Sequence, residues 1–228
     1  MKFNGFSKES ISFLNTVHKR NSKEWFEKNR DKYEKLLLEP FRMLVGELGE
    51  DMLKIDSGFE VRPQINKTIS KIFRDTRFSK DKSIFKKAIW LTFKRPSKDW
   101  KDAPAYFFEL MTDSYRYGLG YYSASRNTMD IFRESINNYP KQFAKAVSFY
   151  SGQSAIELKG DKYKRALICE HPESIQDWYQ RKSFYLVCTK KIDNTLFSTK
   201  LKSEIADNFK TLGPFYKYLQ KHIQTKTP

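Results

Sequence analysis

The segment from Arg74 to Lys86 carries the densest group of chemically useful side chains in the sequence. It reads RDTRFSKDKSIFK, and its candidate ligand-binding residues are Arg74, Asp75, Arg77, Ser79, Lys80, Asp81, Lys82 and Lys86. Guanidinium groups present forked donors that fit phosphate or carboxylate oxygens, and lysines add mobile positive charge. The segment therefore predicts a loop that binds an anionic, phosphate-bearing ligand.

Two other interpretations of this loop stay open. In an enzyme acting on an anionic or phosphorylated small molecule, Asp75 and Asp81 would serve as acid and base or hold magnesium. Ser79 would be the nucleophile of such an enzyme if the fold brought His171 near it. In a purely structural loop the carboxylates would neutralise the arginines, and an extended backbone places Asp75 and Arg77 on one face, where they can pair.

Metal and cofactor signatures are absent from the sequence. The three histidines, His18, His171 and His222, are far apart, and none belongs to an HExxH or Cys/His zinc pattern. There is no Walker phosphate-binding motif, and the glycines at 118 and 120 are too close for a dinucleotide fingerprint. They predict instead a pair of strand glycines that allow close approach, so we expect no metal and no cofactor.

The net charge favours acidic partners. Lys and Arg number 43 against 27 Asp and Glu, which leaves a formal charge of +16. Between Arg62 and Lys101 there are 13 basic and 3 acidic residues, so most of the excess lies in one segment. Such a field favours nucleic acid or another phosphate-bearing ligand, and binding through it would be sensitive to salt. A positive field with no specific ligand is the competing interpretation.

The setting expected for the chain is the cytoplasm. Cys169 and Cys188 stand in apolar sequence and read as small core residues, which suits a reducing compartment. The first ten residues lack the apolar run of a signal peptide, and no stretch of about 18 apolar residues occurs. We therefore expect a soluble protein with no membrane span.

Helical patterns fill residues 1–55. Ser7 is placed to cap a helix that runs to about His18 with Ile11 and Leu14 on its apolar stripe. Ser22 is placed to cap a second helix. Pro40 permits a kink or the start of a third helix, and Gly49 offers a stop signal after it.

Residues 60–228 predict a mixture of strands and helices. Ile89, Leu91 and Phe93 alternate with Ala88, Trp90, Thr92 and Lys94, which predicts a strand. Residues 106–111 and 115–122 are expected to form a second and third strand joined by a short turn. A hairpin of this kind indicates antiparallel pairing. On the other face of the first strand, Trp90 either stacks on a base or packs beneath a helix.

The remaining patterns complete the predicted fold. Asn127 would cap a helix in which Arg133 stands beside the apolar stripe and needs a carboxylate or a bound anion. Further elements are a helix over 139–150, strands over 156–159 and 184–188, and closing helices over 199–209 and 214–223. Together these predict a single α+β domain over residues 1–228, with a mainly antiparallel sheet packed by helices.

These motifs resemble an uncharacterised family, DUF2461. The helical WF...R..Y pattern falls on Trp25, Phe26, Arg30 and Tyr33. The family signature RD.RFSKDK falls on Arg74, Asp75, Arg77, Phe78, Ser79, Lys80, Asp81 and Lys82. Later matches are Gly118, Gly120, Arg133, Lys164, Arg165, His171, Pro172, Arg181 and Lys182.

The chain departs from the family pattern at two places. It has Ile84 and Phe85 where the family has Pro and Tyr, which argues against an essential phenol, and Glu170 where relatives tend to have Asp. The resemblance implies a common fold and a common site but no activity. It adds candidate anion-binding residues to those of the loop, namely Arg133, Lys164, Arg165, His171, Arg181 and Lys182.

Overall fold

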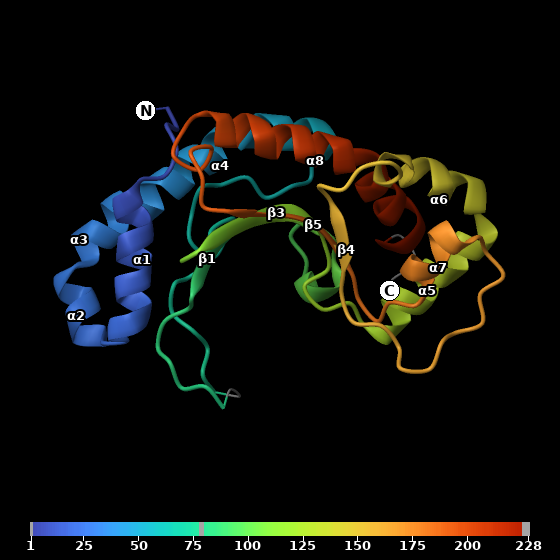
Figure 1. Cartoon of the computed structure of the whole chain (residues 1–228), viewed down its shortest axis with the longest axis horizontal. Coiled ribbons are helices and arrows are strands. Elements are labelled where there is room, and N and C mark those ends of the chain that lie inside the picture. The colour runs from blue at the N-terminus through green and yellow to red at the C-terminus, as the bar shows by residue number, and fades with distance from the viewer. Residues whose placement is uncertain (1, 78–79, 225–228) are drawn as a thin grey trace. The chain divides into compact units, whose positions relative to one another are not determined.

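The chain has an α+β fold, as predicted. The computed structural model describes residues 2–77 and 80–224, and its elements are labelled in Figure 1. Within these residues one antiparallel sheet has five strands in the order β1-β2-β3-β5-β4. The strands are β1 (Ala88–Phe93), β2 (Ala105–Met111), β3 (Ser114–Gly120), β4 (Glu157–Lys159) and β5 (Tyr185–Lys191).

Alternating side chains place these strands in the sheet. Ile89, Leu91 and Phe93 of β1 are buried, which confirms the predicted period of two. The hairpin of β2 and β3 is confirmed as well, although β3 ends at Gly120 rather than Tyr122. Leu158 pairs with Leu186 in the register of β4 and β5.

The chain forms two compact units, each made of segments that are distant in sequence. The first unit consists of Met1–Phe93, Phe107–Tyr117 and Thr189–Asp207. The second unit consists of Lys94–Tyr106, Gly118–Cys188 and Asn208–Pro228.

The helical start of the first unit follows its local signals. Its elements are α1 (Lys8–Arg20), α2 (Lys23–Lys28), α3 (Arg30–Tyr33), a π-helical turn (Glu34–Leu38) and α4 (Glu39–Ile55). The Ser7 side chain accepts the Ser10 N–H at 3.1 Å and the Ser22 side chain accepts the Trp25 N–H at 3.2 Å, so both predicted caps are confirmed.

Two expectations for this region were wrong. Ile11 is only half-buried, and the buried stripe of α1 consists of Phe13, Leu14 and Val17. Gly49 does not end its helix, because α4 continues to Ile55 and buries Met52 one turn further on. Gly49 is itself buried, and a Cβ there would make an ordinary contact with Val61 at 3.6 Å.

Aromatic side chains pack the part of the first unit beneath the 74–86 loop. The ring of Phe26 lies 5.3 Å from that of Phe73 and 5.0 Å from that of Phe85, measured between centroids. Phe73 and Phe85 also form an antiparallel β-bridge. The residues that flank the loop are thus fixed by burial of large apolar rings.

The second unit is built mostly of helices around its own aromatic core. Its helices include α5 (Arg126–Asn138), α6 (Pro140–Ala146) and α7 (Glu173–Tyr179), with single 3-10 turns at Trp100–Asp102 and Ser148–Tyr150. Trp178, Phe184 and Phe215 are buried, with ring centroids 5.0 to 5.8 Å apart. The cap of α5 is Ser125 and not Asn127, because the Ser125 hydroxyl accepts the Thr128 N–H at 3.1 Å.

The closing segment is one helix rather than the predicted two. Helix α8 runs from Lys200 to Leu219 with Pro214 inside it, and a π-helical turn (Gln220–Gln224) follows. Pro214 is exposed, whereas Leu212 and Phe215 are buried. Burial of this continuous apolar stripe offsets the backbone hydrogen bond that proline removes.

Among the residues that the structure describes, Cys169 and Cys188 form no disulfide, and Cys188 is buried. No helix in the described ranges combines the length and the apolar character needed to cross a membrane.

Candidate functional site

The 74–86 loop of the first unit is held at both ends by backbone hydrogen bonds. The Arg74 N–H donates to the Ile84 carbonyl at 2.8 Å, and the Lys86 N–H donates to the Ile72 carbonyl at 2.9 Å. Asn21, which ends α1 in the left-handed conformation, accepts the Ile84 N–H through its side chain at 2.7 Å. Figure 1 shows the loop, drawn on either side of the grey residues 78–79, projecting away from β1.

Both carboxylates of the loop pair with arginines of the loop. Arg77 donates to Asp75 from Nε at 3.0 Å and from Nη2 at 2.7 Å, and Arg74 pairs with Asp81. The pairing predicted for Asp75 and Arg77 is therefore present. These groups remain in contact with water, since the side chains of Arg77 and Asp75 are 77% and 60% exposed.

The same contacts set the protonation of the two acids. The side-chain hydrogen bond from Arg77 is the main cause that lowers the pKa of Asp75 to about 2. Hydrogen bonds from Ser83, aided by Arg74, lower the pKa of Asp81 to about 2. Both carboxyls are ionised at neutral pH, so neither holds the proton that a general acid must donate.

The lysines of the loop differ in their surroundings. Lys80 is exposed, while the Lys82 ammonium donates to the Thr76 carbonyl at 3.0 Å. The Lys86 ammonium donates to the Lys71 carbonyl at 2.6 Å and lies 4.2 Å from the ring centroid of Trp90. Burial is the main cause that lowers the pKa of Lys86. Because Lys86 covers one face of the half-buried Trp90, a base has little room to stack there.

Ser79 lies outside the described residues. Its proposed partner His171 belongs to the second unit, where its Nε2 lies 2.8 Å from the side-chain oxygen of Asn137.

Arg133 of the second unit is a buried structural cation. It donates from Nε to the Tyr179 carbonyl at 2.9 Å, from Nη2 to the Arg181 carbonyl at 2.6 Å, and from Nη1 to Asp130 at 2.9 Å. Its side chain is only 8% exposed. The partner expected for this arginine is thus a carboxylate supplemented by two backbone carbonyls.

Arg181 plays a similar part in the same unit. Its guanidinium donates to the carbonyls of Gly160 at 2.6 Å and Leu158 at 3.1 Å, and to Asp177 at 2.8 Å. Burial opposes the ionisation of Asp177, but Lys162 and Arg181 outweigh it and lower its pKa. We call Arg133, Arg181, Asp130 and Asp177 the arginine cluster. This cluster holds the irregular chain between β4 and α7 in place.

The other candidates of the second unit are exposed. Lys164 and Arg165 lie on the irregular segment before α7. The Lys182 ammonium lies 5.5 Å from the ring centroid of Tyr163. The structure therefore joins Arg133 with Arg181 through one hydrogen bond, and leaves these three cations at the surface.

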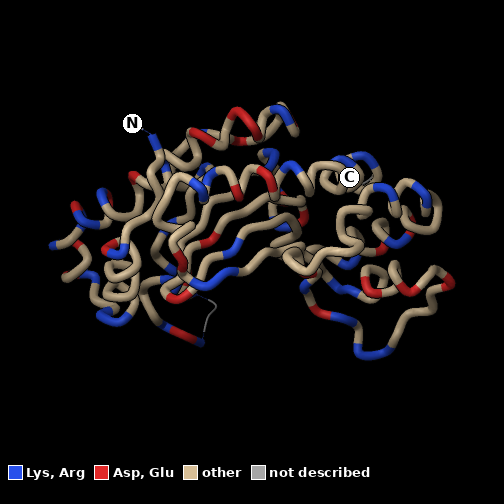
Figure 2. Tube along the Cα trace, turned by 45° about the horizontal axis from the view of Figure 1, so that its top comes forward, with Lys and Arg blue, Asp and Glu red and all other residues tan. Residues whose placement is uncertain are grey.

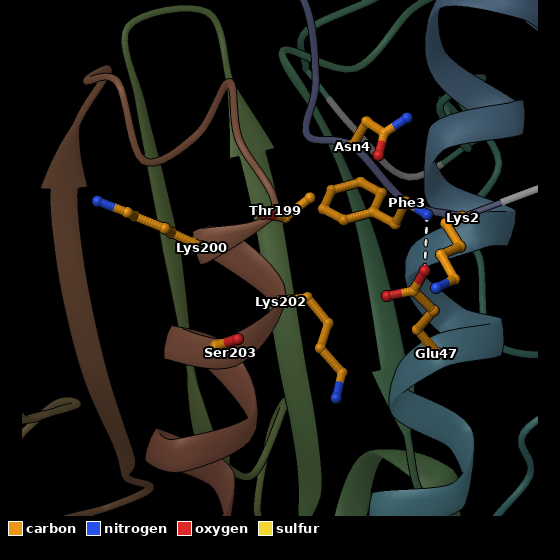
Figure 3. Close-up of a pocket in the computed structure, with 8 residues that line it drawn as sticks. All are labelled: Lys2, Phe3, Asn4, Glu47, Thr199, Lys200, Lys202 and Ser203. Carbon is orange, nitrogen blue, oxygen red and sulfur yellow. Dashed lines mark hydrogen bonds between the residues drawn. The ribbon is translucent and has the colours of Figure 1, made fainter.

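A cavity of the first unit involves none of the predicted residues. It has a volume of about 370 Å³ and lies between the N-terminal segment, α4 and the first turn of α8 (Figure 3). Its lining residues are Lys2, Phe3, Asn4, Glu47, Thr199, Lys200, Lys202 and Ser203. Glu47 accepts the Phe3 N–H at 2.7 Å, and Lys202 pairs with Asp51 at 3.0 Å. No local motif marks these residues, because three distant segments build the wall.

A metal site is not formed by the part of the chain that the structure describes. In residues 2–77 and 80–224, no group of three or more His, Cys, Asp and Glu side chains is arranged to hold a metal ion.

Comparison with known proteins identifies one family. The profile of a family described as conserved hypothetical protein, DUF2461, matches residues 9–218 of the 228. The match includes both the 74–86 loop and the arginine cluster. No curated protein matches the chain.

Proposed function

The chain belongs to the DUF2461 family, and we propose that it binds nucleic acid through phosphate contacts made by the basic segment of its first unit. We define this segment as residues 62–93, which include the 74–86 loop. It contains nine Lys and Arg residues and two Asp residues. Figure 2 marks the charged residues along the Cα trace.

The observation that carries the proposal is that the acids of this segment are paired, whereas several of its exposed lysines are not. Both acids of the segment are already paired with Arg74 and Arg77. Its exposed lysines include Lys71, Lys80 and Lys87, and among the described residues none of these three pairs with a carboxylate. Exposed cations without acidic partners attract phosphates and release counterions when a polyanion binds.

The arginine pairs of the loop are compatible with this function. Exposed ion pairs contribute little to stability, because water and salt screen them. A phosphate offers the same bidentate geometry to a guanidinium as a carboxylate does. Arg77, whose side chain is 77% exposed, can therefore exchange Asp75 for a phosphate without loss of burial.

An enzyme using the two acids is less well supported. Asp75 and Asp81 have a pKa of about 2, which suits charge pairing rather than proton transfer near neutral pH.

The test compares two triple variants that lose the same charge. Lys71, Lys80 and Lys87 are replaced by alanine in one, and the exposed helix lysines Lys8, Lys19 and Lys32 in the other. Fluorescence anisotropy with a labelled oligonucleotide measures the affinity of each. We expect the first variant to bind roughly tenfold or more weakly, and the second to change far less. Equal losses in both variants, or no binding by the parent protein, would contradict the proposal.

A further inference from the structure

Two aromatic side chains of the second unit stand exposed beside each other. Trp100 lies in the 3-10 turn of the connection between β1 and β2, and Tyr122 lies just after β3. Trp100 is 40% exposed and Tyr122 is 70% exposed. Their ring centroids are 5.2 Å apart, and the rings are inclined by 46°. We call these two residues the aromatic pair.

The exposure of the pair calls for an explanation, because the chain buries most of its large rings. Twelve of the largest fully buried side chains of the described residues are aromatic. An exposed indole next to an exposed phenol leaves apolar ring surface in water, which has a cost in free energy. A ligand that covers these rings would recover that cost.

Two hydrogen bonds join the chain segments that carry the two rings. The Ser123 N–H donates to the Lys101 carbonyl at 3.2 Å, and the Ser125 N–H donates to the Asp102 carboxylate at 2.7 Å. The first bond joins the residue after Trp100 to the residue after Tyr122. The pair is therefore positioned before any ligand arrives, which lowers the entropy cost of binding.

Cations surround the pair. The Lys94 ammonium lies 4.0 Å from the ring centroid of Trp100 and that of Lys101 lies at 5.8 Å. Burial lowers the pKa of Lys94. Residues 94–102 include four basic and two acidic side chains, and Lys98 is exposed among them.

We infer that the aromatic pair is a stacking surface for the bases of a single-stranded nucleic acid. The exposed ring of Tyr122 receives a base, and Trp100 supports it from the side. Lys98 and Lys101 meet the phosphates that flank the stacked base. Rings interleaved with cations are the usual means of binding single strands without sequence preference.

The surface fits a base better than a membrane. Insertion into a lipid interface needs a continuous apolar area. The exposed large hydrophobic residues described in this chain are Leu53, Trp100, Tyr122, Tyr139 and Ile168. Only the aromatic pair belongs to the connections 94–104 and 121–125, and the exposed ring of Tyr122 suffices for one base.

This inference rests on the proposed function only in that both involve nucleic acid, since its residues lie outside the basic segment. It predicts a preference that phosphate contacts alone do not produce. The chain should bind a single-stranded oligonucleotide more tightly than an abasic strand of equal length, because both carry the same phosphates and only one carries bases.

The experiment measures binding of Tyr122→Ala to a thymidine oligonucleotide, its uridine RNA counterpart and an abasic strand. We expect about a tenfold loss or more for the two base-bearing strands and little change for the abasic strand. Tyr122→Phe should keep the affinity, since it keeps the ring. Ile168→Ala removes another exposed apolar side chain of the same unit and should have no effect.

The outcomes separate the two proposals. If Tyr122→Ala and Trp100→Ala bind all strands as the parent does, while the triple variant of Lys71, Lys80 and Lys87 is weakened, the stacking surface is refuted and the proposed function stands. If the parent binds no oligonucleotide, both fail. Binding to vesicles of phosphatidylserine that Tyr122→Ala abolishes, with no effect on oligonucleotides, would assign the pair to a membrane instead and overturn the inference.

Discussion

Arg77 and Arg133 carry the same guanidinium group in opposite environments. Arg77 is exposed and forms an ion pair with Asp75 in the 74–86 loop. Arg133 is buried and holds two backbone carbonyls together with Asp130. The sequence presents both arginines as candidates for the same site. Arg77 is exposed enough for the proposed exchange of Asp75 for a ligand, whereas the hydrogen bonds of Arg133 stabilise the fold of the second unit.

Removal of the Arg133 guanidinium should destabilise the protein strongly. Arg133→Met leaves the carbonyls of Tyr179 and Arg181 without this donor inside the second unit, and we expect a loss of about 3 kcal/mol or more in the free energy of unfolding. Arg126 also pairs with Asp130 but is 88% exposed, so Arg126→Met should change the stability by less than about 0.5 kcal/mol. Urea unfolding followed by circular dichroism compares the two.

The Asp75 carboxyl should titrate well below its usual range. Because the folded pKa is depressed to about 2, the pairing with Arg77 is fully present above the ordinary pKa of Asp and is lost as the pH falls through the folded value. Carboxyl NMR should show a midpoint near 2 in the parent and a midpoint closer to the ordinary value of 3.8 in Arg77→Gln. An unchanged midpoint in the variant would show that Arg77 is not the cause.

Residue pairs close in sequence were predictable, and distant partners were not. Alternation along an extended chain gives the Asp75 and Arg77 pair directly. The distant partners of Arg181 are the carbonyls of residues 158 and 160, which carry no side-chain signal at all. The aromatic pair was missed for the same reason, since only the tertiary fold reveals which of many aromatic side chains remain exposed.

At the scale of elements, the glycines of β3 show how strands approach one another. A Cβ on Gly118 would overlap the carbonyl oxygen of Leu186, and one on Gly120 would overlap Tyr185. The expectation that these glycines allow close approach is therefore confirmed, and no dinucleotide motif is needed to explain them.

Replacing a β3 glycine by alanine should lower the stability, whereas the same replacement on an exposed helix surface should raise it. Gly118→Ala forces the backbone of β5 to move and should cost more than about 2 kcal/mol. Gly46 is exposed on α4, and a Cβ there would meet no described atom within 4 Å, so Gly46→Ala should stabilise by about 0.5 to 1 kcal/mol. Thermal unfolding of the two variants measures both signs, and a neutral Gly118→Ala would contradict the close approach.

Element boundaries failed where tertiary burial overrules local signals. The caps at Ser7 and Ser22 were predictable, because a hydroxyl and the first helical N–H groups are neighbours in sequence. Gly49 and Pro214 look like breaks, yet α4 and α8 continue through them to bury Met52 and Phe215. From the sequence, only the local cost of a helix breaker can be judged. In the fold, burial of the apolar residues on either side offsets that cost.

At the scale of the whole molecule, the charge of +16 predicts that the proposed binding of nucleic acid depends on salt. The logarithm of the affinity for a single strand should fall linearly with the logarithm of salt concentration, by about 0.7 for each phosphate contacted. The Lys71, Lys80 and Lys87 variant should lower this slope by about 2 if each lysine meets a phosphate. Titrations at several salt concentrations check the slope, and a flat dependence would exclude a phosphate-driven mode.

Lys164 and Arg165 sit on the exposed, irregular stretch between β4 and α7, where trypsin can reach the peptide bond that follows each of them. Such a cut leaves Leu158 and Gly160 on the first fragment and Arg181, which donates hydrogen bonds to their carbonyls, on the second. The strands β4 and β5, which pair with each other, also lie on different fragments. A chain cut only after Lys164 or Arg165 should thus run as two fragments on a denaturing gel and still elute from a sizing column as one particle.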